Sequence, residues 1–220
     1  LLPGANALEV AEQVKQTMQQ LANGFPKGVD WHVWYDSSTF IEAAITEVLI
    51  TLVEALFIVI LVVFLFLQNW RATLIPALAV PVSIVGTFAI MAALGFTLNT
   101  VNLLALVLAI GIVVDDAIVV VENVERLMKE EMLSAAEATK KAMKELTGAL
   151  VATSLVLAAV FIPVSFLAGI TGIMYREFAI SITVAVLIST IVALTLSPAL
   201  CAILLKKEPE HSGAIARFFD

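Results

Sequence analysis

Long apolar runs separated by short polar breaks fill most of the chain. Five of these runs hold roughly 20 apolar-dominated residues each, enough for a helix to cross a hydrocarbon layer of about 30 Å. They predict spanning helices at about 46–67, 73–94, 99–124, 147–168 and 174–205. Pro81 and Pro163 lie inside two of the runs, and membrane helices tolerate such prolines when neighbouring groups satisfy the freed carbonyls. The pattern therefore predicts an all-α polytopic membrane protein.

The first 38 residues follow a different pattern. Apolar residues at helical spacing predict a helix over about 7–22. Alternating apolar positions then predict a half-buried strand, with Val29, Trp31, Val33 and Tyr35 on one face. A single strand has two open edges, so its partners are expected in another part of the protein. Residues 1–38 are therefore expected to be a short α/β remnant of a larger domain outside the membrane.

Two shorter helices are expected outside the spans, a cytoplasmic amphipathic helix and the start of a helix on the membrane surface. Ser134 and Glu137 have the spacing of a capping box and are expected to open a helix over 134–146 with a solvated basic face. Residues 206–220 are expected to form a polar tail in which 214–219 begin a helix lying on the membrane. The membrane part of the chain is then 39–205.

Composition narrows the class of protein further. Hydrophobic residues make up 61% of the chain and charged residues only 14%, whereas a soluble domain carries nearer a quarter charged residues. The net charge of −7 does not suggest nucleic-acid binding. The single cysteine, Cys201, excludes a disulfide within the chain, and no cysteine cluster suggests a zinc or iron–sulfur site. No cofactor and no metal is therefore expected.

Basic residues are divided unevenly between the two sides of the predicted spans. Nine of the twelve fall on one side: Arg71, Arg126, Lys129, Lys140, Lys141, Lys144, Lys206, Lys207 and Arg217. Lys15, Lys27 and Arg176 fall on the other. The positive-inside rule makes the side with nine residues cytoplasmic, so the N-terminal segment is outside and the C-terminal tail is inside. This orientation is expected to need one further span upstream, which makes six per unit.

Two adjacent acids, Asp115 and Asp116, interrupt the third predicted span. Inserting a carboxylate into hydrocarbon costs roughly 2.5–3.5 kcal/mol, and chains that keep such residues usually use them to carry protons or ions. Two carboxylates this close in a low dielectric are expected to titrate as a pair. No Lys or Arg lies in the middle of any predicted span, so the counter-charge is expected from outside this chain. Asp115 and Asp116 are therefore the candidate proton-translocating residues.

Four further residues are candidates for a supporting role. Gly111, four residues before Asp115, lets another backbone come close to the pair. Glu54 in the first span is equally consistent with a proton entry path and with an interfacial or helix-bonding residue. Glu122 and Asn123 lie near the cytoplasmic end, where a plain interfacial role is at least as well supported.

Simpler interpretations of these polar residues compete with proton transport. In one, the aspartates are protonated and only bond neighbouring helices, although membrane helices rarely keep acids without a use for them. A metal site is less favoured, because no His or Cys is close in sequence and only Glu122 adds a third carboxylate. Asn99 and Asn102 are interpreted as the outer cap of the third span and a helix–helix hydrogen bond.

Several segments together resemble one transporter family. The run from Gly111 to Arg126, GIVVDDAIVVVENVER, closely resembles the fourth transmembrane helix of resistance-nodulation-division (RND) transporters, and its double aspartate is typical of the multidrug (hydrophobe/amphiphile efflux) branch. The segments 66–76 (FLQNWRATLIP) and 197–201 (SPALC) are similar to flanking family segments. Residues 3–7 (PGANA) resemble the end of a periplasmic porter subdomain. The resemblance covers nearly the whole chain.

The resemblance implies a place in a larger assembly. The chain is expected to be helices two to six of the first of two RND repeats, with residues 1–38 as the C-terminal piece of a porter subdomain. RND transporters are inner-membrane homotrimers that pass drugs to a periplasmic adaptor and an outer-membrane channel. The aspartate pair in the family faces a lysine and other polar groups of the second repeat. The N-terminal segment is then periplasmic.

The function expected from the sequence is secondary active transport, not enzymatic catalysis. The leading hypothesis is the proton-translocating part of a drug/proton antiporter that exports hydrophobic and amphiphilic compounds. One alternative is a lipid or protein-export transporter of the RND superfamily, which the aspartate stripe alone does not exclude. The other is a truncated membrane module that does not transport.

Overall fold

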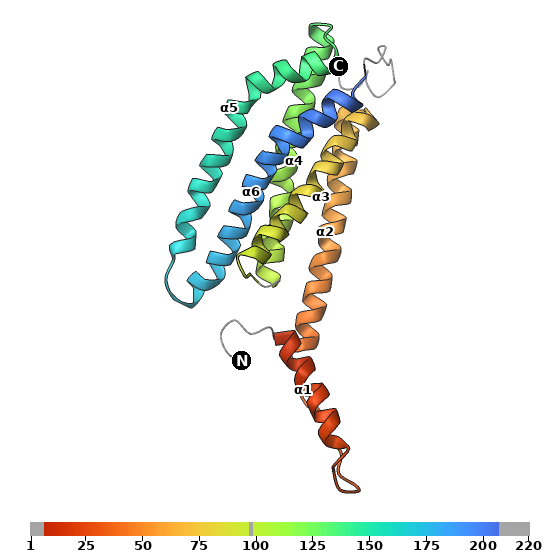
Figure 1. Ribbon diagram of the computed structural model, residues 1–220, viewed down its shortest axis with the longest axis vertical. Coiled ribbons are helices and arrows are strands. Elements are labelled where there is room, and N and C mark those ends of the chain that lie inside the picture. Colours follow the sequence, from red (N-terminus) through yellow and green to blue (C-terminus); the bar gives the residue numbers. More distant parts are fainter. Residues whose placement is uncertain (1–6, 97–98, 207–220) are drawn as a thin grey trace.

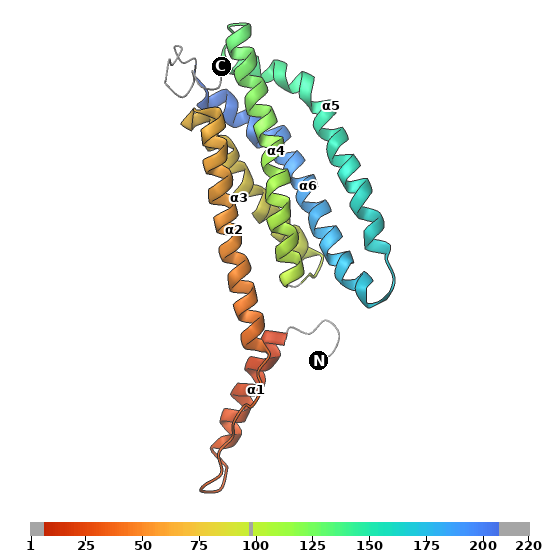
Figure 2. The same ribbon diagram turned by 180° about the vertical axis from the view of Figure 1, so that it is seen from behind.

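The chain folds into a bundle of long helices with one helix projecting from its end. The computed structural model describes residues 7–96 and 99–206, and over these residues it contains helices and no β-strand. Helices α2 to α6 lie side by side, while α1 extends away from the end of the bundle at which α2 begins (Figures 1 and 2). The elements are α1 (Ala7–Ala22), α2 (Ser38–Leu67), α3 (Trp70–Ala93), α4 (Thr100–Glu130), α5 (Ala135–Phe161), the 3-10 helix η1 (Ile162–Phe166) and α6 (Gly169–Leu204).

Five helices have the length and apolar composition needed to cross a membrane, which confirms the all-α polytopic fold. They correspond to the five predicted spans, but four of them begin earlier than predicted and one, α4, ends later. Helix α2 begins at Ser38 and α4 continues to Glu130, well beyond the apolar runs. A helix longer than about 20 residues can extend beyond a hydrocarbon layer of about 30 Å, where charged residues are tolerated. The length of an apolar run therefore predicts which residues can lie in the membrane, but it does not predict where the helix begins or ends.

The predicted strand at 29–35 is wrong. The chain turns back beyond α1 and runs along it to the start of α2 without forming a strand (Figure 1). Val29, Val33 and Tyr35 of the predicted apolar face are 56%, 44% and 80% exposed, so the alternation does not bury one face. A strand is stable only when a neighbouring strand receives its backbone hydrogen bonds, and the described residues offer none. Instead, Lys15 of α1 forms a 2.5 Å ion pair with Asp36, just before α2.

The separate amphipathic helix expected at 134–146 is also wrong, because α5 runs without a break from Ala135 to Phe161. Its start is as predicted: Ser134 and Glu137 form the capping box reciprocally. Gly148 is the weakest helix former near the expected boundary between the two predicted helices. A glycine destabilises a helix by only about 1 kcal/mol relative to alanine, which is not enough to end it. The α-helix ends instead just before Pro163, where the chain tightens into η1.

The core is built around α4 and α6. About half of their most apolar stretches is buried, 50% and 56%, whereas only 6% of the corresponding stretch of α2 is buried. Ile110, Val113 and Val114 of α4 pack against α2 and α3, while Ala105 packs against α6. Helix α3 also approaches α6 closely at Gly86, where a Cβ would lie 3.0 Å from Ile188 Cγ2. Small residues therefore bring α3, α4 and α6 together.

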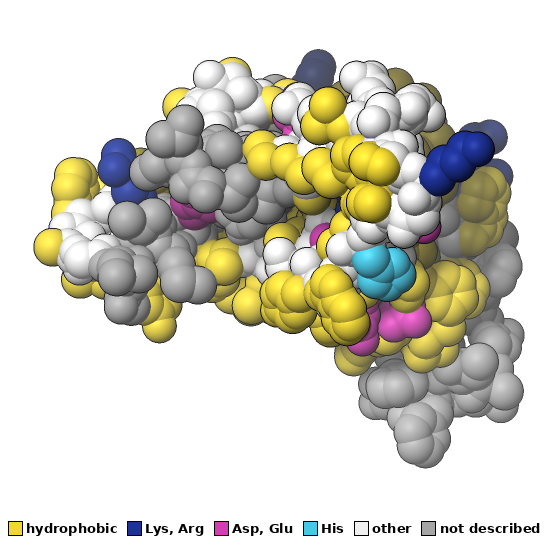
Figure 3. Space-filling model, turned by 90° about the horizontal axis from the view of Figure 1, so that it is seen from below, with side chains coloured by type: hydrophobic (Ala, Val, Ile, Leu, Met, Phe, Trp, Pro, Cys, Tyr) yellow, Lys and Arg dark blue, Asp and Glu magenta, His cyan; other side chains and the backbone are white. Residues whose placement is uncertain are grey.

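The two ends of the bundle differ in charge. The α2–α3 and α4–α5 connections meet the end of α6 at one end of the bundle, and the α3–α4 and α5–α6 connections lie at the other, near α1 (Figure 1). The first end carries Arg71, Arg126, Lys129, Lys140, Lys141, Lys144 and Lys206. Seen from the second end, the molecule shows mainly apolar side chains and few Lys or Arg (Figure 3). The predicted tail helix at 214–219 lies outside the described residues.

Candidate functional site

The candidate site lies at the middle of α4, where α4 packs on α6. The register of α4 is fixed at its start by Asn99, whose side chain accepts the backbone N–H of Asn102 at 2.9 Å. Asn102 is buried and accepts a 3.3 Å hydrogen bond from the Ser181 hydroxyl of α6. Both asparagines therefore have the roles predicted for them. Their bonds hold α4 and α6 in register along the length that carries the aspartates.

Asp116 faces α6 and is half-buried. Its Oδ2 accepts a 2.7 Å hydrogen bond from the hydroxyl of Ser189, a residue only 2% exposed. The same hydroxyl lies 3.4 Å from the carbonyl oxygen of Val113, one turn earlier on α4. A hydrogen bond to a charged acceptor is roughly twice as strong as one between neutral groups. Ser189 therefore provides Asp116 with a buried donor inside the bundle.

Asp115 faces a different way, because successive helical residues are turned by about 100°. Its side chain is exposed on the surface of the bundle, on a stripe of α4 that also includes Leu108, Gly111, Val119 and Glu122. Nothing lies within 4 Å of the position that a Cβ on Gly111 would take. The backbone approach expected at Gly111 is therefore not made by any described residue. The adjacent acids thus occupy two distinct surroundings, one packed and one open.

None of the ion pairs among the described residues involves the two aspartates. Arg126 pairs with Glu130 at 2.7 Å and with Glu145 at 3.3 Å, and Lys141 pairs with Glu131. Over residues 7–96 and 99–206, no Lys or Arg contacts Asp115 or Asp116 in an ion pair. A positive charge for the pair is expected from outside this part of the protein.

The structure separates the other predicted candidates from the pair. Glu54 is exposed on α2 and lines a shallow hollow with Val53 and Ile50. The face of α2 that packs on α3 and α4 carries Leu52, Ala55, Leu56 and Val59 instead. Glu54 therefore points away from α4.

Glu122 and Asn123 lie further along α4. Glu122 is exposed on the stripe of Asp115. The Asn123 side-chain oxygen accepts a 2.7 Å hydrogen bond from Arg126, so Asn123 belongs to the polar group at the basic end. Among the described residues, no group of three His, Cys, Asp or Glu side chains has the arrangement of a metal site.

Ser189 is the residue of the site that sequence reasoning missed. It lies inside the long apolar run of α6, and composition alone gives a hydroxyl there no special weight. A signal was nevertheless present: small residues recur at every fourth position of α6, namely Ser181, Ala185, Ser189, Ala193 and Ser197. Such a row lets another helix come close, and it is this face that meets α4.

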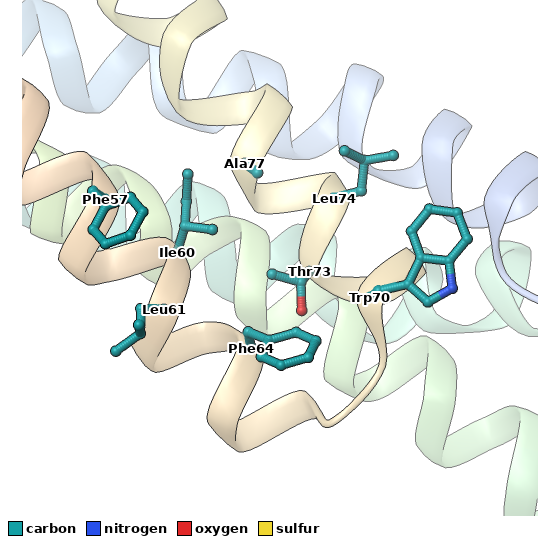
Figure 4. A pocket seen from close by; sticks show the side chains of 8 residues that line it. All are labelled: Phe57, Ile60, Leu61, Phe64, Trp70, Thr73, Leu74 and Ala77. Atoms are coloured by element: carbon teal, nitrogen blue, oxygen red, sulfur yellow. The ribbon is translucent and has the colours of Figure 1, made fainter.

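An open hollow of about 330 Å³ lies between α2 and α3, and the aspartates do not line it. Figure 4 shows its lining, with Phe57 at one end and Trp70 at the other. Thr73 contributes the only hydroxyl, which donates to the Asn69 carbonyl at 2.9 Å. The hollow is mainly apolar and none of its lining side chains is an acid or a base, so it does not compete with the aspartates as a proton-carrying site.

Comparison with known proteins identifies close relatives over the whole chain. The profile of the AcrB/AcrD/AcrF family matches residues 1–220. The chain is 52% identical over 220 residues to the multidrug export protein AcrF of Escherichia coli (strain K12), which covers 100% of this chain and 21% of AcrF. It is 52% identical over 210 residues to the multidrug resistance protein MdtF of the same strain, covering 96% of this chain and 20% of MdtF.

A third relative comes from another genus. The toluene efflux pump membrane transporter TtgB of Pseudomonas putida is 50% identical over 221 residues, covering 100% of this chain and 21% of TtgB. The chain thus spans about a fifth of the length of the relatives it matches.

Proposed function

The chain belongs to the AcrB/AcrD/AcrF family of resistance-nodulation-division multidrug efflux transporters, and on this premise we propose that it is the proton-translocating transmembrane part of a drug/proton antiporter. The observation that carries the proposal is the pair at the middle of α4. Asp116 is held by Ser189 inside the bundle at 2.7 Å, and Asp115 is open on its surface. The pair therefore offers one acid that contacts a neighbouring helix and one that is accessible from outside the bundle.

The physical cost of charge drives the proposed proton step. An unpaired carboxylate in the membrane interior is expensive, so a proton or a cation must neutralise it. A cation on a neighbouring helix stabilises the anionic form of the pair, and its withdrawal favours protonation. Movement of that helix is then coupled to proton uptake and release. One proton moving down a potential of 100 mV supplies about 2.3 kcal/mol to each cycle.

The neutralising cation is proposed to come from the remainder of the transporter, which includes the second transmembrane repeat. Two observations support a larger assembly: the chain spans about a fifth of its relatives, and α2 is buried over only 6% of its most apolar stretch. We place the chain in a homotrimer that works with a periplasmic adaptor and an outer-membrane channel. Relatives named for multidrug export and toluene efflux support hydrophobic and amphiphilic compounds as substrates.

The proposed location is the bacterial inner membrane, with the basic end of the bundle in the cytoplasm. Seven described Lys and Arg residues lie at that end, at the start of α3, towards the end of α4, in the first part of α5 and after α6. Retention of such residues in the cytoplasm is the strongest sequence determinant of orientation. Helix α1 and the N-terminal segment are then periplasmic.

Drug export by the full-length transporter tests the proposal. Asp115→Asn and Asp116→Asn each keep the shape of the side chain but remove its ability to ionise. Each is expected to abolish export from cells while insertion and trimer assembly stay at the parental level. Glu130→Gln is the matched control on α4, because Glu130 forms only an exposed ion pair with Arg126. Parental export by both aspartate variants rules out the proposed role.

A further inference from the structure

Helix α6 places two buried hydroxyls against α4, but only one of them meets an acid. The Ser181 hydroxyl lies 3.3 Å from the neutral side-chain oxygen of Asn102 and 2.7 Å from the Glu177 carbonyl oxygen of its own helix. Ser189, two turns later, donates to the Asp116 carboxylate at 2.7 Å. Both serines are almost completely buried, at 0% and 2% exposed. The two contacts are therefore alike in position and burial and differ in the charge of the acceptor.

Ser189 has a second acceptor within reach. Its Oγ lies 3.4 Å from the Val113 carbonyl oxygen and 2.7 Å from Asp116 Oδ2. A serine hydroxyl has one proton to donate and two lone pairs that accept. It can therefore donate to the carboxylate, or turn to the carbonyl and accept a proton from a neutral carboxylic acid. Either arrangement leaves no buried polar group without a partner.

We propose that Ser189 is a positioning residue for the proton step at Asp116, a proposal that rests on the proton-carrying role of Asp116 given above. When Asp116 is ionised, the Ser189 hydroxyl donates to its carboxylate. When Asp116 takes up a proton, the new O–H donates to Ser189 Oγ, and the Ser189 proton turns to the Val113 carbonyl. One proton enters the site and no other atom leaves it. The hydroxyl thus keeps a hydrogen bond to the acid in both states, and the bond to the ionised form is the stronger of the two.

The arrangement also couples the proton state of Asp116 to the neighbouring helices. Thr190, the next residue of α6, shares a hydrogen bond with Ser154 of α5. A turn of the Ser189 hydroxyl therefore occurs where α4, α5 and α6 are joined by side-chain hydrogen bonds. No hydrogen bond from another described helix reaches Asp115. Of the two acids, Asp116 is therefore the one whose protonation changes a hydrogen bond with α6.

Few other titratable groups lie near enough to obscure this effect. On α4 the neighbour is Asp115. Between Glu177 and Lys206, α6 carries no Asp, Glu, Lys, Arg or His, and its one titratable residue is Cys201. Helix α3 has no charged residue after Arg71, and α5 has none after Glu145. Glu54 of α2 is exposed and directed away.

The pH dependence of transport by the full-length protein in proteoliposomes tests the proposal. Ser189→Ala removes the hydrogen-bond donor to the carboxylate. In a plot of transport rate against pH, the limb at low pH is therefore expected to shift to higher pH by about one unit. Ser189→Thr keeps a hydroxyl and is expected to restore the parental profile. Ser181→Ala is the matched control. It removes an α6–α4 hydrogen bond from a neutral acceptor, so it is expected to leave the profile in place.

The outcomes separate the two proposals. If Ser189→Ala and Ser181→Ala have the same pH profile, the role of Ser189 is wrong. If Asp116→Asn transports at the parental rate in the same vesicles, the proposed function itself is wrong. Should Ser189→Ala fail to assemble, Ser189→Cys decides, because a thiol is a weaker donor of similar shape. It is expected to shift the profile in the same direction by a smaller amount, and an unchanged profile contradicts the proposal.

Discussion

Asp116 and Ser189 join α4 to α6 by a 2.7 Å hydrogen bond at the middle of the bundle. Asp115, the adjacent residue, is turned to the open surface of α4. Two identical side chains therefore meet different surroundings because one helical step changes the direction they face. The adjacent acids therefore lie in two different places, one between α4 and α6 and the other on the open surface of α4.

The close approach of α3 to α6 at Gly86 predicts a size limit. A Cβ there lies 3.0 Å from Ile188 Cγ2, so Gly86→Leu is expected to destabilise the transporter by about 1–3 kcal/mol through overpacking. Gly148 is the control, because nothing lies within 4 Å of its Cβ position and Leu is the better helix former. Thermal unfolding in detergent measures both. A Tm for Gly86→Leu equal to or above that of Gly148→Leu contradicts the close packing.

The orientation of the bundle predicts which residues are accessible from each side. Cysteines replacing Lys129 and Lys140 should react with a membrane-impermeant reagent only from the cytoplasm. Cysteines replacing Lys15 and Lys27 should react only from the periplasm. The native thiol does not interfere, because Cys201 is fully buried. Labelling of position 15 from the cytoplasm overturns the five-span orientation.

The ion pair between Lys15 and Asp36 predicts an acid-sensitive attachment of α1. The hydrogen bond from Lys15, together with those from Ser38, lowers the pKa of Asp36 to about 2. Because this pKa is below the value of about 3.9 in an unfolded chain, the contact stabilises the fold above pH 4 and is lost as the pH falls towards 2. The distance between spin labels on α1 and α2 should therefore be constant from pH 7 to about pH 4 and increase below it.

A charge-free variant provides the control for this attachment. Asp36→Asn is expected to show the altered label distance already at pH 7, with no further change on acidification. Asp30→Asn is expected to keep the parental behaviour, since Asp30 bonds only the neighbouring Trp31 backbone N–H. A distance in Asp36→Asn identical to that of the parent at every pH contradicts the role of the ion pair.

The chain by itself is expected to insert into a membrane without transporting. Its helices are long and apolar enough to span, but its described residues bring no cation to Asp115 or Asp116. An uncompensated charge in the membrane interior is costly, so the isolated chain lacks a group needed for the proposed cycle. Proton flux in proteoliposomes that hold residues 1–220 alone measures this. Drug-driven flux in these vesicles contradicts the expectation.

Local pattern predicted the parts of the structure that depend on local physics. Five spans follow from apolar run length, and the Asn99 cap and the Ser134–Glu137 capping box follow from side-chain chemistry at helix starts. The strand at 29–35 failed because alternation describes one strand and says nothing about a partner. The continuity of α5 was missed because the change from a basic face to an apolar run looks like a boundary, although no residue there ends a helix.

The site was predicted only in part for a related reason. The adjacent acids are evident in the sequence because they are rare in an apolar run. Ser189 is not, because its importance comes from which residue of α4 it meets, and that depends on how two distant helices pack. Glu54 was included because it is an acid in a span, but the packing face of α2 directs it away from α4.

Substrate-dependent proton flux in proteoliposomes tests the central claim most directly. With the full-length transporter and an imposed pH gradient, addition of a drug should accelerate proton movement in the parent and in Glu130→Gln. Asp115→Asn and Asp116→Asn should each reduce the drug-dependent flux to that of protein-free vesicles, since losing a step worth about 2.3 kcal/mol per 100 mV removes the driving force. Drug-dependent flux at the parental rate in both aspartate variants contradicts the claim that this pair carries the proton.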